Sequence, residues 1–281
     1  MKLPRLSWRQ LLWSCFLVAI PSNLLALDGI ILIDQNRALA GNITPGDAPG
    51  FPVTISQSGM YRLTGNITVP DANTTAVQIT SSFVTLDLNG FSIIGPTVCT
   101  DDPIACPSPG TGIGVQASTD GAPGPRGVRV VNGTVRGMGA FGILMTGDGS
   151  FVEKVTLDSN AGGGVVAAGT VLDSAATHNG RFGILAITVR ECTALKNAGN
   201  GINLDGSGGV GIGNISSFNT GVGISVPNGS ASNNTMVRNQ SFGLTSICPS
   251  SIVGNTIVGN DGGSIQTSRD GCVLVDNATR P

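Results

Sequence analysis

A repeat of about 20 residues is the feature that most constrains how this chain can fold. From Asn160 onward, an asparagine is followed four residues later by a glycine and then by an aliphatic residue. The series runs Asn160/Gly164/Val165, Asn179/Gly183/Ile184, Asn197/Gly201/Ile202, Asn219/Gly223/Ile224, Asn239/Gly243/Leu244, then Asn260 with Ser264/Ile265, and ends at Asn277. Short alternating stretches, separated by Gly, Asn and Ser, fill each unit, and no helical period runs through it. Such a unit predicts one coil of a parallel β-solenoid.

Stacked coils place equivalent residues in columns, because each coil lies about 4.8 Å from the last. The residue after the glycine is aliphatic in every unit, which predicts an interior column made of Ile143, Val165, Ile184, Ile202, Ile224, Leu244 and Ile265. Another column lies five residues before the repeated asparagine and contains Asn214, Asn234 and Asn255. Amide side chains stacked at this spacing hydrogen-bond from coil to coil. The sequence therefore predicts two asparagine ladders.

This pattern resembles the right-handed parallel β-helix repeat proteins of the pectin-lyase-like superfamily. The resemblance covers roughly residues 55–279, and VTLDLNGFSIIG at 84–95 and VRVVNGTVRG at 128–137 are similar to its early coils. It implies an all-β, right-handed parallel β-helix of about ten coils with an N-terminal cap. Lyases, hydrolases, epimerases and non-enzymatic surface proteins share this scaffold, so the fold alone does not assign an activity.

Residues 1–26 are typical of a secretory signal peptide. A basic start precedes an apolar run over 11–20, and the small residue Ala26 suits the position before a cleavage site. The run is shorter than the roughly 20 apolar residues that a membrane-spanning helix needs. We therefore expect export to the periplasm, the cell surface or the medium, with no transmembrane segment after cleavage.

The segment 27–54 is expected to cap the first coil, and residues 55–281 to form one β-helix domain. A cap is needed because an open solenoid end exposes unpaired strand edges. Within the segment, Asp34 to Ala40 is predicted to form a short helix.

The net charge of the chain limits the kinds of partner that it attracts. Without the leader, which carries the basic residues Lys2, Arg5 and Arg9, the chain has 12 basic and 17 acidic residues and a formal charge of −5. Long-range attraction therefore disfavours nucleic acid and other polyanions as partners, unless a local basic patch exists. A polysaccharide is the partner that the resemblance implies, and the sequence does not indicate an oligomeric state.

Cysteine spacing predicts two disulfides in an exported chain. Cys99 and Cys106 bracket a short loop, and Cys248 and Cys272 are the second expected pair. Cys192 is expected to be a buried free thiol, because four coil steps, roughly 19 Å, separate its place in the column from that of Cys272. With no CxxC motif and one histidine in the chain, the sequence predicts no zinc site and no cofactor.

Charged residues share columns in neighbouring coils, and these are the candidate catalytic groups. His178 and Lys196 directly precede ladder asparagines, whereas Lys154, Asp173 and Glu191 share another offset. A lyase must neutralise a uronate carboxylate and remove a proton with a suitable base, and Lys or His beside an acid suits that chemistry. The alternative is a surface charge ladder, which contributes little per pair.

The candidate ligand-binding residues lie on the strand after each glycine and in one loop. That strand face lines the binding groove of the superfamily, and Asn203 and Asp205 are its polar candidates here. Asp101 and Asp102 lie in the loop 96–111, which is expected to project beside the solenoid. Calcium is an alternative ligand for these two carboxylates, although it requires six to eight oxygens.

Two functions remain open from the sequence. The acidic and basic clusters of pectate lyases and the aspartates of polygalacturonase-like hydrolases are missing from the expected groove. The pattern therefore favours a non-catalytic exported β-helix that binds polysaccharide or acts at the cell surface. The alternative is an enzyme, either a lyase or an epimerase, that acts on a uronate-containing polymer.

Overall fold

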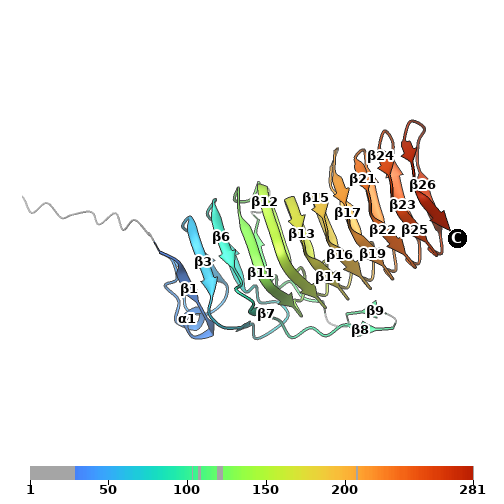
Figure 1. Ribbon diagram of the computed structural model, residues 1–281. Coiled ribbons are helices and arrows are strands. Elements are labelled where there is room, and N and C mark those ends of the chain that lie inside the picture. The colour runs from blue at the N-terminus through green and yellow to red at the C-terminus, as the bar shows by residue number, and fades with distance from the viewer. Residues whose placement is uncertain (1–28, 103, 107–108, 119–122, 207, 281) are drawn as a thin grey trace, which may run out of the picture.

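The computed structural model describes residues 29–102, 104–106, 109–118, 123–206 and 208–280. The chain forms a right-handed parallel β-solenoid of about ten turns, as the repeat predicts. In Figure 1 the coils follow one another along a single axis, from blue at the N-terminal end to red at the C-terminal end. The predicted signal peptide lies outside the described residues and stays a prediction. Within the described part of the chain, no helix has the length and apolar character needed to cross a membrane.

Three faces make up the solenoid, and on each face a strand pairs in parallel with the strand of the next coil. The first face, which follows the glycine of the repeat, comprises β2 (Val53–Ile55), β5 (Val77–Ile79), β10 (Val115–Ala117), the first parts of β12 (Ile143–Asp158), β13 (Val165–Leu172) and β15 (Ile184–Arg190), then β17 (Ile202–Leu204), β20 (Ile224–Pro227), β23 (Phe242–Ile247) and β26 (Gly263–Thr267).

The long strands β12, β13 and β15 bend onto the second face. The other strands of that face are β1 (Ile31–Ile33), β3 (Gly59–Leu63), β6 (Val84–Asp87), the first part of β11 (Arg129–Arg136), β18 (Val210–Ile212), β21 (Ser230–Ser232), β24 (Ser251–Val253) and β27 (Val273–Val275). The third face comprises β4 (Ile67–Thr68), β7 (Ser92–Ile94), the ends of β11 and β12, β14 (Ala175–Thr177), β16 (Thr193–Leu195), β19 (Ile215–Ser217), β22 (Thr235–Val237), β25 (Thr256–Val258) and β28 (Ala278–Arg280).

Side chains alternate between inward and outward positions along the strands, and the inward ones fill the interior. The column that follows the glycine is fully buried from Ile143 to Leu244 and partly buried at Ile265. Because one side of each solenoid strand before β26 is buried in this interior, those coils bury their apolar residues only against their neighbours.

Two of the three corners between faces, from the second to the third face and from the third to the first, follow one plan. An outward residue with positive φ turns the chain, and an inward residue directly after it supports the next strand. At the corner from the third to the first face, the inward residues form the first ladder, in which each Asn Nδ2 donates to the next Asn Oδ1 at 2.9 Å. At the corner from the second to the third face, Asn214, Asn234 and Asn255 form the predicted second ladder with the same 2.9 Å spacing.

The position of Asn277 shows that the register expected for the last coil is wrong. Asn277 accepts from Asn255 Nδ2 and so ends the second ladder, whereas the repeat assigned it to the first. The physical reason is coil length. Asn277 lies 22 residues after Asn255, within the span of the other coils, while 17 residues after Asn260 is too few for a complete coil. Cys272 accordingly leaves the column of Cys192.

The N-terminal segment contains the predicted helix as α1 (Gln35–Ala40), which begins after Asp34. The Asp34 side chain accepts from the backbone N–H of Arg37, which satisfies one free donor of the first turn. In the same segment β1 pairs with β3 and β2 pairs with β5, so these strands extend the solenoid. The capping role of this segment stays a prediction.

The cysteines pair as the spacing predicts. Disulfides join Cys99 to Cys106 and Cys248 to Cys272. Cys192 is free and buried, as expected, and its backbone N–H donates to Asn214 Oδ1 at 2.9 Å. Burial raises the pKa of the Cys192 thiol to about 12.

Candidate functional site

A disulfide-closed hairpin lies against one corner of the solenoid. Its strands β8 (Thr100–Asp101) and β9 (Ile104–Ala105) are antiparallel, and Figure 1 shows them beside the stacked coils. The Sγ atom of Cys106 lies 3.8 Å from the backbone oxygen of Asn160. A Cβ at Gly180 would lie 2.8 Å from the same sulfur, so glycine at this position permits the close approach. The loop is therefore held at the corner between the third and first faces.

The outward residues of this corner form the Lys196 column, which comprises Ser159, His178, Lys196, Phe218 and Arg238. All of them have φ between 51° and 56°, so the same turn repeats from coil to coil. Parallel pairing of β14 with β16 places His178 and Lys196 in adjacent coils, as the sequence predicts.

Asp101 connects the hairpin to this column. Its two carboxylate oxygens accept from Lys196 Nζ at 2.9 and 3.0 Å, and one of them lies 3.2 Å from His178 Nε2. The hydrogen bond from Lys196 is the main cause that lowers the pKa of Asp101, and the charges of Lys196 and His178 act in the same direction. At neutral pH Asp101 is therefore an anion that faces a cation.

The far side of the histidine ring meets a second carboxylate. His178 Nδ1 lies 3.3 Å from Asp158 Oδ1, which also accepts from the Thr177 hydroxyl at 2.6 Å. Ser159 Oγ donates to the other oxygen of Asp158 at 3.0 Å. Because its own position is held by two hydroxyls, Asp158 orients the imidazole. We call Asp101, Asp158, His178 and Lys196 the corner site.

A cavity of about 400 Å³ opens beside the corner site. Its lining combines acids, a cation, an aromatic ring, two aliphatic side chains and neutral hydrogen-bonding groups: Asp101, Asp102, Ile104, Lys196, Ala198, Phe218, Thr220 and Gln240. Phe218 is 43% exposed, and the guanidinium of Arg238 lies 5.8 Å from the centroid of its ring. Such a lining suits a ligand that carries both hydroxyl groups and charge.

The other predicted catalytic residues lie elsewhere. Lys154, Asp173 and Glu191, which we call the Glu191 column, are the outward residues of the corner from the second to the third face, with φ of 48° to 54°. A strand of the third face separates them from the Lys196 column. In the described part of the structure no ion pair joins them to one another, and Lys154 instead lies 3.7 Å from Glu153.

Asn203 and Asp205 lie on and just after β17 of the first face. Asn203 accepts from Asn200 Nδ2 at 2.8 Å, and the backbone N–H of Asp205 donates to Ala186 O at 2.8 Å. Neither residue lines the cavity of the corner site. Asp102 does line it, next to Asp101.

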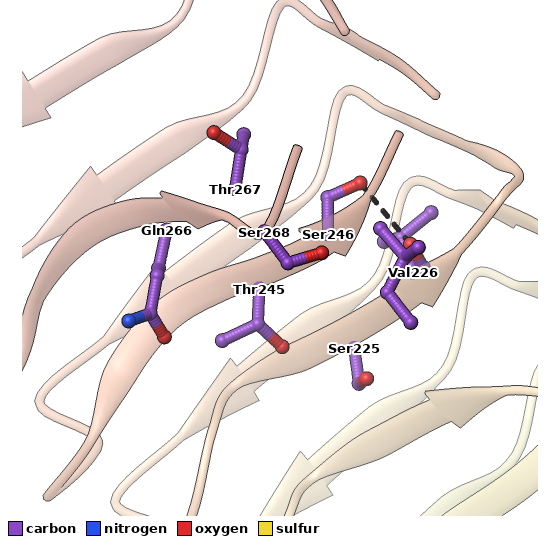
Figure 2. Close-up of a pocket in the computed structure, with 8 residues that line it drawn as sticks. Ser225, Val226, Thr245, Ser246, Gln266, Thr267 and Ser268 are labelled. Atoms are coloured by element: carbon purple, nitrogen blue, oxygen red, sulfur yellow. Dashed lines mark hydrogen bonds between the residues drawn. The ribbon is translucent and has the colours of Figure 1, made fainter. Parts of the chain in front are cut away.

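A second cavity, of about 310 Å³, lies on the first face near the C-terminal end. Figure 2 shows Ser225, Thr245 and Gln266 in a row across three neighbouring strands, with Ser246 and Ser268 beside them. Its polar lining consists of hydroxyl and amide groups, which suits a neutral, hydroxyl-rich ligand.

Sequence reasoning missed Asp158 as a member of the corner site. The signal was present in the register, because Asp158 pairs with Thr177 on the next coil and so lies beside His178. Among the described residues, no group of three or more His, Cys, Asp or Glu side chains has an arrangement that could hold a metal ion.

Comparisons with known proteins agree on the architecture. The family profile described as "Right handed beta helix region" matches residues 128–279, just over half of the chain. No curated protein matches the sequence at a significant level.

Solved structures with similar folds share little sequence. The A-module of an Azotobacter vinelandii mannuronan C-5 epimerase has a TM-score of 0.56 at 14% identity, over 79% of this chain and 86% of that one. The Dettilon tailspike protein has a TM-score of 0.53 at 17% identity, over 80% of this chain and 52% of that one. A periplasmic alginate epimerase has a TM-score of 0.50 at 12% identity, over 90% of this chain and 84% of that one. At these identities the likeness shows the fold alone.

Proposed function

Since the chain belongs to the right-handed β-helix family, we propose that it is an exported polysaccharide-binding protein without catalytic activity. The polysaccharide binds across the corner site and the first face, in the periplasm, at the cell surface or outside the cell. Two structural neighbours are a mannuronan epimerase and an alginate epimerase, which is consistent with a saccharide ligand.

One observation carries this proposal. Residues of the two polar cavities lie on the same two coils. Thr220 in the corner cavity and Ser225 in the first-face cavity lie five residues apart in one coil, and Gln240 and Thr245 have the same separation in the next. A polymer with repeating hydroxyl groups can therefore meet repeated hydroxyl and amide partners as it crosses successive coils.

The corner site favours a second function, a lyase or an epimerase that acts on a uronate polymer. His178 is oriented by Asp158, and Lys196 lies on the adjacent coil. A base that removes the proton next to a uronate carboxylate needs a cation to stabilise the charge that develops, and these two residues supply that pair. In the free protein Asp101 contacts both groups, so a substrate would first have to displace this carboxylate.

Binding and turnover can be separated in one experiment. The purified protein is titrated calorimetrically with alginate, polygalacturonate and neutral dextran. The same samples are followed by ultraviolet absorbance for unsaturated uronate and by NMR in D₂O for deuterium incorporation. We expect binding without either product signal. Either signal, if lost in His178→Ala, establishes the enzymatic alternative, and no binding to any polymer contradicts both functions.

A further inference from the structure

The contacts of Asp101 are those that a ligand carboxylate would make. One planar carboxylate places both oxygens on Lys196 Nζ and one on His178 Nε2. The partners come from the solenoid itself, whereas Asp101 comes from a hairpin 95 residues earlier in the chain. Lys196 and Asp101 also line the open cavity together, so a ligand in that cavity can reach the same cation.

The contact is of a kind that a ligand can displace. The Asp101 side chain is 63% exposed and that of Lys196 is 38% exposed. Exposed ion pairs of this type contribute little to stability, because water solvates both charges well when they separate. The disulfide between Cys99 and Cys106 nevertheless keeps the carboxylate near Lys196, which gives it a high effective concentration.

Charge along the corner points to an anionic ligand. The Lys196 column presents His178, Lys196, Phe218 and Arg238 on four consecutive coils, so basic side chains flank an exposed aromatic ring. The chain as a whole is acidic, which disfavours anions at long range. The column therefore supplies the local cations Lys196 and Arg238, although Asp102 and Asp158 lie near them, and Asp101 is the acid that pairs with Lys196 in the free protein.

We propose that Asp101 is an internal substitute for a ligand carboxylate, and that the corner site binds a uronate-type sugar by exchanging that carboxylate for Asp101. The inference rests on the proposed polysaccharide binding and adds to it the class of sugar and the way in which the free site is regulated. Binding breaks the ion pair between Asp101 and Lys196 and forms an equivalent pair between Lys196 and the sugar.

The test compares Asp101→Asn with Asp102→Asn. Both substitutions remove one negative charge from the same cavity, but only Asp101 pairs with Lys196 in the described structure. Alginate oligosaccharides and neutral dextran oligosaccharides are titrated against each variant by calorimetry. We expect Asp101→Asn to tighten alginate binding by about two- to fivefold, which corresponds to the loss of a competing exposed ion pair. Asp102→Asn should produce a smaller gain, and dextran binding should not change.

The outcomes separate this inference from the function on which it rests. Alginate binding that is weaker in Asp101→Asn, or tightened no more than in Asp102→Asn, overturns the inference, because Asp101 would then organise the site or act only through its charge. Dextran binding equal to alginate binding in the wild type also overturns it, while polysaccharide binding stands. If no variant binds either sugar, the proposed function fails and the inference fails with it.

Discussion

The Lys196 column and the Glu191 column are the same backbone position at two corners of one solenoid. Both consist of outward residues with φ near 50°, each followed by an inward residue that supports the next coil. Both carry charges in the same neighbouring coils. They differ in what covers them, because the hairpin places Asp101 against His178 and Lys196, whereas no described segment brings an acid or a base to Asp173 and Glu191 in an ion pair.

This difference shows how a repetitive fold acquires a site. The corner turn tolerates any residue that can adopt positive φ, so a charge at this position does not by itself indicate chemistry. Of these two corners, the one to which a non-repetitive insertion returns has the cavity and the converging charged groups.

The largest effect is expected where the corners are alike, in the ladders. Asn197 and Asn234 each donate Nδ2 to the next Asn and to a backbone carbonyl, and each accepts two N–H groups from the previous Asn. Asn197→Leu and Asn234→Leu leave buried donors and acceptors without partners, at about 1–3 kcal/mol for each group. We expect either variant to lose about 2–5 kcal/mol of unfolding free energy in denaturant titrations. An unchanged stability in one of them would mean that the two ladders are not equivalent.

The next largest effect is a dependence of stability on pH, caused by the thiol of Cys192. This residue takes the inward position after Glu191. Its folded pKa of about 12 lies above the ordinary thiol value of 9.0. Between these values the unfolded chain releases the proton while the folded chain retains it, so stability falls as pH rises, by up to about 1.4 kcal/mol per pH unit. Urea melts from pH 8 to pH 10 should show this decline in the wild type and a smaller one in Cys192→Ala. Parallel declines would contradict the buried, neutral thiol.

The sequence predicted the repetitive part of this comparison well. Periodicity alone assigned the interior column, most of both ladders and the neighbouring positions of His178 and Lys196, because stacked coils convert spacing into contact. It could not place Asp101 on those residues, since the direction of an irregular loop depends on tertiary contacts and not on the repeat. The same limit explains Asn277, where coil length varies and two assignments compete.

A smaller effect should separate the outward columns. Lys196→Ala and Glu191→Ala make the same change at equivalent positions in one coil, so any backbone strain is matched. If the corner site binds an acidic polysaccharide, Lys196→Ala should weaken alginate binding about fivefold, the value of an exposed ion pair of about 1 kcal/mol. Glu191→Ala should bind as the wild type does. If Glu191→Ala tightened alginate binding as much as Lys196→Ala weakened it, general surface charge, and not the corner site, would determine binding.

The smallest expected effect is a shift in the titration midpoint of the Asp101 carboxyl group. Because the hydrogen bond from Lys196 is the main cause of its lowered pKa, the folded state favours the charged carboxylate. The contact is therefore present above the ordinary aspartate pKa of about 3.9 and is lost as pH falls through the lower folded value. The carboxyl carbon of Asp101, followed by NMR from pH 7 to pH 2, should titrate with a midpoint below that ordinary value. In Lys196→Ala the midpoint should rise, whereas in Lys154→Ala, a change in the uncovered column, it should stay where it is in the wild type. A midpoint that is the same in all three proteins would mean that the hairpin does not hold Asp101 against Lys196 in solution, and the two corners would then be alike.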